Sequence, residues 1–486
     1  MSKQPNILIF MTDQELADVV GPDHPCITPN ADRLAASGIR FNQTYTCTAH
    51  CCPSRATFHS GLFPSRHGIW NNVCNPSAIG TSLADGVTLF SEHLRDAGYN
   101  LAHAGKWHVC ADDMPGDRGW EDLGSHPKRG DMHGQPVDRF RKMTVDTSPR
   151  KFGQIKRLGW GDYQHFGSTE AIRGHRFEDC NDYKVVQRGI AKLPQLAKQD
   201  APWCLYIGTN GPHDPFVVPQ KFLDLYADVD VPLPASFEDQ MTDKPGAYQV
   251  MRKQTWDQLS EEEHRAAIRH YWAFCTAMDD LLGQTLGALD ATGQADDTLV
   301  IFMSDHGDYC GSHGLYMKGV PAFREAYHVP CIARWPSGIA QPGRAVDQFV
   351  SMADFAPTFC QVAGARMRED YTGCSLTPFF RNEAPADWRD TMYTQFQGVE
   401  LYYTQRVTWT KDHKYVYNGF DFDELYDLQA DPHETRNLAA DPAYEEVKHE
   451  LCRRMWRFAA QQDDGKIFNP YPTTAKAPWG PADALQ

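Results

Sequence analysis

The most informative run of this sequence is Cys51-Cys52-Pro53-Ser54-Arg55, which brings a thiol, a hydroxyl and a guanidinium close together. If a helix starts at this run, Arg55 lies one turn beyond Cys51 and both side chains face the same site. Cys51 could then be a nucleophile, for instance with His108 or His213 as its base. The alternative is an ordinary thiol in a turn before a helix, so other parts of the sequence must decide.

Polar clusters also follow four short apolar runs that are typical of buried strands. The runs are residues 6–12, 101–105, 203–209 and 298–304, and the clusters are Asp13-Gln14, Lys106-Trp107-His108, His213-Asp214 and Asp305-His306. In an open α/β sheet, functional groups collect beyond the carboxyl ends of the strands. A single Asp after a strand is commonly a turn residue, but four clusters together predict one shared site.

These motifs, in this order, resemble those of the type I, formylglycine-dependent sulfatases of the alkaline phosphatase superfamily. The matching runs are Asp-Gln after the first strand, Cys-x-Pro-Ser-Arg, Gly-Lys-Trp-His, Pro-His-Asp-Pro and Ser-Asp-His-Gly. The resemblance continues in residues 61–68 and 424–438, so it covers nearly the whole chain. Cys-x-Pro-Ser-Arg is specific in this context, whereas the other motifs are individually weak.

The resemblance implies that a maturation enzyme oxidises Cys51 to formylglycine (3-oxoalanine), whose hydrate attacks sulfur. The second hydroxyl of the hydrate lets the sulfate ester collapse and restores the aldehyde, which a simple thiol or alcohol cannot do. The resemblance also implies one divalent metal ion, for which this donor set favours Ca²⁺, with Mn²⁺ and Mg²⁺ as alternatives. The implied metal-site residues are Asp13, Gln14, Cys51, Asp305 and His306.

Further catalytic roles are implied in the same way. Arg55 would orient the hydrate, and Lys106 and Lys318 would neutralise charge on the sulfate oxygens. His108 would be the base of the collapse step, and His213 would donate to the sulfate or to the leaving oxygen. In isolation, each Lys is more simply a solvated charge and each His a core residue; the motif context favours function, least securely for Lys318.

The identity of the ester leaves alternatives open. Phosphonate monoester hydrolases and phosphodiesterases of the same superfamily share the formylglycine and the metal pattern. Ser54, Lys106 and His108 favour a sulfate monoester, because those relatives tend to carry other residues at these positions. A small sugar, alkyl or aryl sulfate is the expected substrate. A non-catalytic protein that binds sulfated ligands is the alternative from another class, if Cys51 stays a thiol.

The net charge, the N-terminal residues and the cysteines indicate which partners and which cellular compartment to expect. The chain has 486 residues and a net charge of −16, which argues against nucleic-acid or anionic-membrane partners. The apolar run of residues 7–11 is too short for a signal-peptide core, and the 14 Cys residues show no disulfide pattern. We therefore expect a cytoplasmic protein with reduced thiols. The basic stretch of residues 128–142 is expected to be a charged loop that could line the substrate mouth.

The alternation of strands and helices predicts an α/β fold, with a large, mostly parallel sheet sandwiched by helices as in alkaline phosphatase. A further strand is expected at residues 329–335, and helices at 29–37, 89–97 and 260–291. After a polar linker near residue 381, residues 390–396, 401–410 and 414–418 alternate like antiparallel strands, and 444–461 resemble a helix. We predict a catalytic domain of residues 1–380, a smaller α+β domain of 381–465, and a tail of 466–486 at a possible subunit interface of a homo-oligomer.

Overall fold

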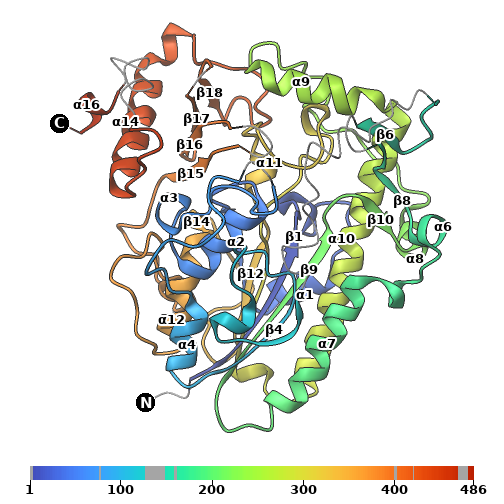
Figure 1. Cartoon of the computed structure of the whole chain (residues 1–486), viewed down its shortest axis with the longest axis vertical. Helices are drawn as coiled ribbons and strands as arrows, with labels where there is room; N and C mark the ends of the chain where they lie inside the picture. The colour runs from blue at the N-terminus through green and yellow to red at the C-terminus, as the bar shows by residue number, and fades with distance from the viewer. Residues whose placement is uncertain are drawn as a thin grey trace.

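An eight-stranded sheet runs through the middle of the molecule (Figure 1). The computed structural model describes residues 4–75, 78–125, 148–157, 161–398, 402–419, 421–468 and 480–485. Along the sheet, the strand order is β13 (Arg344–Val346), β2 (Ile39–Phe41), β12 (Cys331–Arg334), β11 (Thr298–Ser304), β1 (Asn6–Asp13), β9 (Trp203–Pro212), β4 (Asn100–Gly105) and β5 (Glu121–Ser125). All neighbours are parallel except β12, which is antiparallel to both β11 and β2.

Helices cover both faces of this sheet, as the burial of β1 requires. Leu8 and Phe10 belong to one apolar cluster, whereas Ile7, Ile9 and Met11 belong to another. The first cluster is shared with α1 (Pro29–Ala36), α7 (Asn181–Leu196) and α10 (Glu261–Asp290). The second is shared with α2 (Cys51–Ser60), α4 (Phe90–Asp96) and α12 (Phe355–Val362), which lie on the other side of the sheet in Figure 1. The mostly parallel, sandwiched sheet predicted from the sequence is confirmed.

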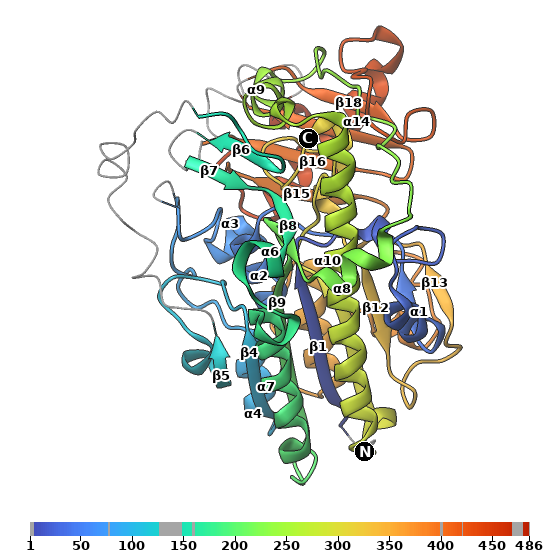
Figure 2. The same cartoon turned by 90° about the vertical axis from the view of Figure 1, so that its right-hand side faces the viewer.

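A four-stranded antiparallel sheet forms the C-terminal part, in the order β15 (Met392–Phe396), β16 (Gln405–Trp409), β17 (His413–Asn418) and β18 (Glu424–Asp427). Helix α14 (Glu445–Gln461) packs on it through Leu451, Met455 and Trp456. Figure 2 shows this sheet beyond the C-terminal end of β1, the end at which Asp13 lies.

Short elements complete the described chain. The helices are α3 (Pro64–His67), α6 (Thr169–Arg173), α8 (Gln220–Leu223), α9 (Gly246–Thr255), α11 (Arg324–Tyr327), α13 (Thr377–Phe380) and α16 (Pro481–Ala484). The strands are β3 (Thr44–Tyr45), β6 (Gln154–Arg157), β7 (Gly161–Gln164), β8 (Phe166–Ser168), β10 (Phe216–Val218) and β14 (Val350–Ser351). Among the described helices, none is long and apolar enough to cross a membrane.

Two expectations lie largely outside the described residues, namely the basic stretch of residues 128–142 and most of the tail from residue 466. The proposed domain boundary near residue 381 stays a prediction. The expected strand at residues 329–335 forms as β12, and its antiparallel direction was not predicted. Strand β18 is also missing from the predicted strands, because residues 424–438 are interpreted above only through the family resemblance.

Candidate active site

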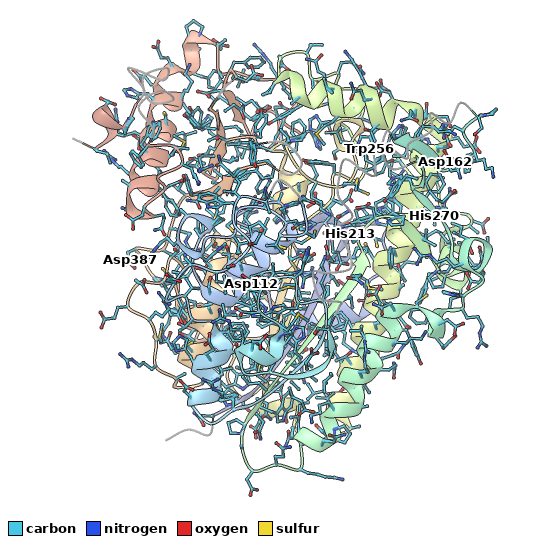
Figure 3. The ribbon with its side chains drawn as sticks, viewed as in Figure 1. Asp112, Asp162, His213, Trp256, His270 and Asp387 are labelled. Carbon is cyan, nitrogen blue, oxygen red and sulfur yellow. The ribbon has the colours of Figure 1, made fainter. Side chains whose placement is uncertain are left out.

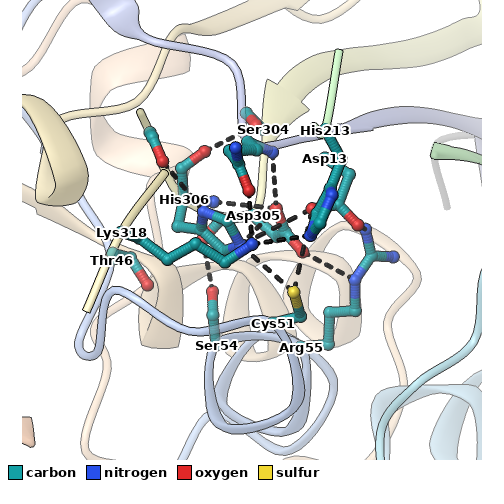
Figure 4. Close-up of polar contacts among 12 residues, drawn as sticks. Asp13, Thr46, Cys51, Ser54, Arg55, His213, Ser304, Asp305, His306 and Lys318 are labelled. Atoms are coloured by element: carbon teal, nitrogen blue, oxygen red, sulfur yellow. Dashed lines mark hydrogen bonds and ion pairs between the residues drawn. The ribbon is translucent and has the colours of Figure 1, made fainter. Parts of the chain in front are cut away.

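Four buried side chains converge beyond the carboxyl ends of β1 and β11. One ligand atom from each of Asp13, Cys51, Asp305 and His306 lies within 4.8 Å of the others. The Cys51 Sγ is 3.2 Å from the His306 Nε2 and 3.8 Å from the Asp13 Oδ1. Figure 4 shows Cys51, Ser54 and Arg55 on one helix, facing Asp13, Asp305 and His306. Two carboxylates, one imidazole and one position for a nucleophile form a candidate metal centre.

The sheet register explains this convergence. Strands β1 and β11 are parallel neighbours, with Thr12 opposite Ser304, so Asp13 and Asp305 leave the sheet side by side. Helix α2 begins at Cys51, with His50 in extended conformation just before it. The Ser54 hydroxyl donates to the Asp305 backbone carbonyl at 2.5 Å, which fixes the first turn of α2 against the end of β11. The motif run therefore supplies both the nucleophile position and its anchor.

Arg55 connects the two carboxylates. Its Nε donates to the Asp305 Oδ2 at 2.8 Å, and its Nη2 lies 3.6 Å from the Asp13 Oδ2. Its Nη1 donates to the Tyr206 hydroxyl at 3.0 Å. Burial alone would raise the pKa of Asp305, but the charges of Arg55, His306 and Lys106 hold that pKa below its usual range. Asp305 is thus an ionised carboxylate in a fully buried position, which suits a metal ligand.

Gln14 lies at the edge of the cluster, in a left-handed backbone conformation with φ of 68°. Its backbone N–H donates to the Asp305 Oδ1 at 3.2 Å, and its side-chain Oε1 accepts a hydrogen bond from Lys318. The Gln14 Nε2 donates to Asp214 at 3.1 Å and to Asp308 at 2.5 Å. Gln14 therefore presents an amide oxygen beside the carboxylates while its amide nitrogen is anchored by two acids.

Lys318 and His213 form a second pair near the cluster (Figure 4), and Figure 3 shows the position of His213 in the whole molecule. The Lys318 Nζ is 2.6 Å from the His213 Nε2, and the His213 Nδ1 is 2.7 Å from the Asp214 backbone carbonyl. Burial and the Lys318 charge lower the pKa of His213 to about 4, so the ring is neutral at pH 7. The geometry assigns the ring proton to Nδ1, which donates to Asp214, and leaves Nε2 to accept from Lys318.

Lys106 and His108 come directly after the C-terminal end of β4. The Lys106 Nζ donates to the Asp13 Oδ2, and burial lowers the pKa of Lys106 to about 8. Burial, with the charges of Lys106 and Arg55, lowers the pKa of His108 well below its usual value. The His108 Nδ1 is buried and has no hydrogen-bond partner among the described residues. His108 is therefore a neutral imidazole with one nitrogen free to accept a proton.

The structure brings together all the residues that the sequence analysis singled out, although their catalytic roles stay predictions. It adds residues that the analysis had not assigned. Asp214 belongs to one of the polar clusters named above and Asp308 lies two residues after His306, but nothing in the sequence indicates that both hold Gln14. His50 lies beside the site, where burial and the charges of Lys318 and His306 lower its pKa well below the usual value. Tyr206 comes from the middle of β9, where no sequence signal marked it.

The chain is similar in sequence and in fold to proteins that are already known. Residues 5–365 match the sulfatase family, and residues 311–461 match the N-sulphoglucosamine sulphohydrolase C-terminal family. A choline-sulfatase from Rhizobium meliloti is 30% identical, over 90% of this chain and 83% of its own. An N-acetylglucosamine-6-O-sulfatase from Bacteroides thetaiotaomicron is 25% identical, over 95% of this chain and 88% of its own. The phosphonate monoester hydrolase structure from Agrobacterium radiobacter is 26% identical, covers 94% of this chain and 96% of its own, and has a TM-score of 0.75.

Proposed function

The chain belongs to the sulfatase family of sulfuric ester hydrolases, and from this premise we propose that it cleaves the sulfate monoester of a small sugar, alkyl or aryl alcohol. The observation that carries the proposal is the position of Cys51 at the first turn of α2, against Asp13 and His306. In this proposal Cys51 is converted to formylglycine by a maturation enzyme, and the nucleophile is an oxygen of the aldehyde hydrate.

An unmodified Cys51 is a poor candidate for the nucleophile. Burial raises the pKa of its thiol to about 12, so a thiolate would be scarce at pH 7. An unmodified Cys51 would then be a weak nucleophile in this position. A formylglycine hydrate instead supplies two hydroxyl groups, one to attack sulfur and one to allow release of sulfate.

The donor set fits a divalent cation. The two carboxylates and the imidazole are fully buried, and their ligand atoms lie within 4.8 Å of one another. The Gln14 backbone N–H donates to the Asp305 Oδ1, and the Gln14 amide oxygen accepts a hydrogen bond from Lys318. Asp13, Gln14, Asp305 and His306 would hold the ion, together with the modified Cys51; we propose Ca²⁺ first and Mn²⁺ or Mg²⁺ as alternatives. Such an ion supplies positive charge that lowers the pKa of a hydroxyl group and polarises the ester.

Side chains of the protein would orient the hydrate, bind the sulfate oxygens and transfer protons. The Arg55 Nη2 lies 3.6 Å from the Asp13 Oδ2 but has no hydrogen-bond acceptor among the described residues, so its N–H groups would orient the hydrate. Lys106 and Lys318 approach from two flanks and would hold the sulfate oxygens as charge develops. Because the Lys318 Nζ donates to the His213 Nε2, Lys318 would pass a proton to this nitrogen, and His213 would deliver that proton to the leaving oxygen. His108, with its unpaired Nδ1, would take the proton in the collapse step.

Phosphonate monoester hydrolysis is the second candidate, supported by the phosphonate monoester hydrolase among the similar structures. Ser54, Lys106 and His108 favour sulfate, because the family resemblance implies other residues at these positions in such enzymes. A low side activity on phosphonate or phosphate esters is expected, because the site recognises a tetrahedral oxyanion.

The test is release of sulfate from a panel of sulfated sugars, alkyl and aryl sulfates and choline sulfate, beside phosphonate monoesters and phosphate diesters. We expect turnover of at least one sulfate ester, its loss in Cys51→Ala, and its retention in Cys52→Ala. Cys52 is the matched control because it is the next residue of α2 and points into the apolar core. Turnover confined to phosphonate or phosphate esters would overturn the proposal.

A further inference from the structure

A cavity of about 510 Å³ opens beside the candidate active site. Lys106 and His213 line it at the end nearest the metal-ligand cluster, and α10 supplies an apolar wall of Phe274, Ala277 and Met278. This volume is in the range of small-ligand sites. A sulfate ester whose sulfur lies between Lys106 and His213 would project its alcohol into this cavity.

The carboxylates that line the cavity are already engaged by the protein. Asp182 accepts hydrogen bonds from the backbone amides of Asn210 and Gly211, at 2.7 and 3.2 Å. Asp214 is held by Gln14 and Tyr163. Asp179 accepts the backbone amide of Arg176 at 3.1 Å. These acids thus already accept hydrogen bonds from the protein, and the Asp179 Oδ2 also lies 3.8 Å from the Arg176 Nε.

Arg173 differs from these residues. It is the last residue of α6, is exposed, lines the same cavity, and makes no hydrogen bond or ion pair with any described residue. By contrast, the Lys184 Nζ, also on the cavity wall, donates to the Asp179 backbone carbonyl at 2.8 Å. Arg173 thus presents a guanidinium with unused donors towards the space that the alcohol would occupy, and this group matches carboxylate and sulfate geometry.

The aromatic residues of the cavity do not form a cage for a quaternary ammonium group. The ring of Phe177 carries the Lys221 ammonium 4.1 Å from its centroid, so its face is already used by a cation. Among the described residues, Phe274 is the other phenylalanine on the cavity wall, and recognition of quaternary ammonium groups relies on several aromatic faces around the cation. The cavity is better suited to an anionic substituent than to a cationic one.

We propose that this cavity binds the alcohol part of the substrate and that Arg173 binds a second anionic group on it, either a carboxylate or a second sulfate. The inference rests on the proposed sulfatase function and adds the class of alcohol. The apolar wall of α10 would contact the ring or carbon skeleton of the alcohol, and Arg173 would select esters that carry a further negative charge.

The test compares kcat/KM for matched esters in wild type, Arg173→Gln and Arg176→Gln. One pair is 4-carboxyphenyl sulfate and its neutral carboxamide; the other is glucosamine 2-N,6-O-disulfate and N-acetylglucosamine 6-O-sulfate, whose N-acetyl group is uncharged. Arg176 is the matched control, because it is exposed, lies three residues further on and does not line the cavity. Comparing the two pairs distinguishes carboxylate from sulfate as the recognised group.

We expect wild type to prefer the anionic member of at least one pair. Arg173→Gln should lower kcat/KM for that member by about tenfold and change the neutral member by less than about twofold, as expected for loss of one partly exposed charge-assisted contact. Equal rates within both pairs, or equal effects of Arg173→Gln and Arg176→Gln, would overturn the inference. A strong preference for choline sulfate would overturn it as well. Absence of turnover with every sulfate ester, including those whose second substituent is uncharged, would identify failure of the proposed function itself.

Discussion

At the scale of single residues, the site is a balance of buried charges. Arg55 and Lys106 neutralise the negative charges of Asp13 and Asp305. Lys318 donates a hydrogen bond to the Gln14 side chain. Breaking a buried ion pair leaves an uncompensated charge, which is strongly destabilising. The residues of the site therefore contribute to folding as well as to chemistry, so variants must be compared with matched controls.

Lys106→Met should lower kcat/KM for the preferred sulfate ester by about 100-fold to 1000-fold, because one preorganised charge at the developing oxyanion is lost. Lys192→Met is the control, since Lys192 is a partly covered lysine of α7 that pairs with Glu121 away from the site. We expect the control to retain activity within about twofold. Steady-state kinetics with both variants checks this prediction. Equal losses of kcat/KM in the two variants would show that Lys106 has no catalytic role.

His213→Gln should lower kcat by about 100-fold, as expected for loss of a positioned proton-transfer group. The effect should be smaller for an ester with a good leaving group, such as 4-nitrophenyl sulfate, than for an alkyl sulfate, because a good leaving group needs less protonation. Rates for both esters in wild type and variant test the assignment. An identical loss for both esters would indicate that His213 only positions Lys318.

At the scale of elements, much of this architecture could be predicted from the sequence. The buried runs at residues 6–12 and 298–304 form β1 and β11, and the long helix expected at residues 260–291 forms α10. What could not be predicted is the pairing of strands far apart in the chain. The parallel contact of β1 with β11 places Asp13 beside Asp305, and the role of Tyr206 depends on the position of β9 next to β1. Such long-range register is not encoded in local periodicity.

Glu263 gives an element-scale prediction. It closes the capping box of α10 with Ser260 and pairs with Arg150 at 2.6 Å. Burial would raise its pKa, but the bond from Arg150 and two backbone amides lower it from 4.5 to about 2. Because the folded pKa is depressed, this stabilisation is full above pH 4.5 and is lost as the pH falls towards 2.

Glu263→Gln should therefore lower the free energy of unfolding by about 1–2 kcal/mol at pH 7. Glu262→Gln, in the same turn but exposed, should change it by less than about 0.5 kcal/mol. Urea unfolding of both variants at pH 7 and pH 3 tests this, and the difference from wild type should shrink at the lower pH. A difference that stays constant with pH would contradict the assignment of the stabilisation to the ionised carboxylate.

At the scale of the whole molecule, the metal-ligand cluster joins distant parts of the chain. Its residues come from the first strand, from α2 and from the segment after β11, and Lys318 and Gln14 extend it. A ligand that binds only the folded state stabilises it by mass action. The account thus predicts coupling between metal binding, activity and global stability.

Removal of the metal by a chelator should abolish sulfate release and lower the melting temperature, and Ca²⁺, Mn²⁺ or Mg²⁺ should restore both. At a free ion concentration 100-fold above Kd, the stabilisation would be about 2.7 kcal/mol. Calorimetry and activity assays with each ion measure the two effects and rank the metals. Full activity after exhaustive chelation would contradict the metal assignment.

The mass of the peptide that carries Cys51, measured in a preparation that releases sulfate, shows directly whether the active enzyme contains formylglycine. We predict a peptide about 18 Da lighter than the unmodified one, as expected when formylglycine replaces cysteine, and a turnover rate that rises with the modified fraction. A preparation that cleaves sulfate esters at full rate while Cys51 remains an intact thiol would contradict it.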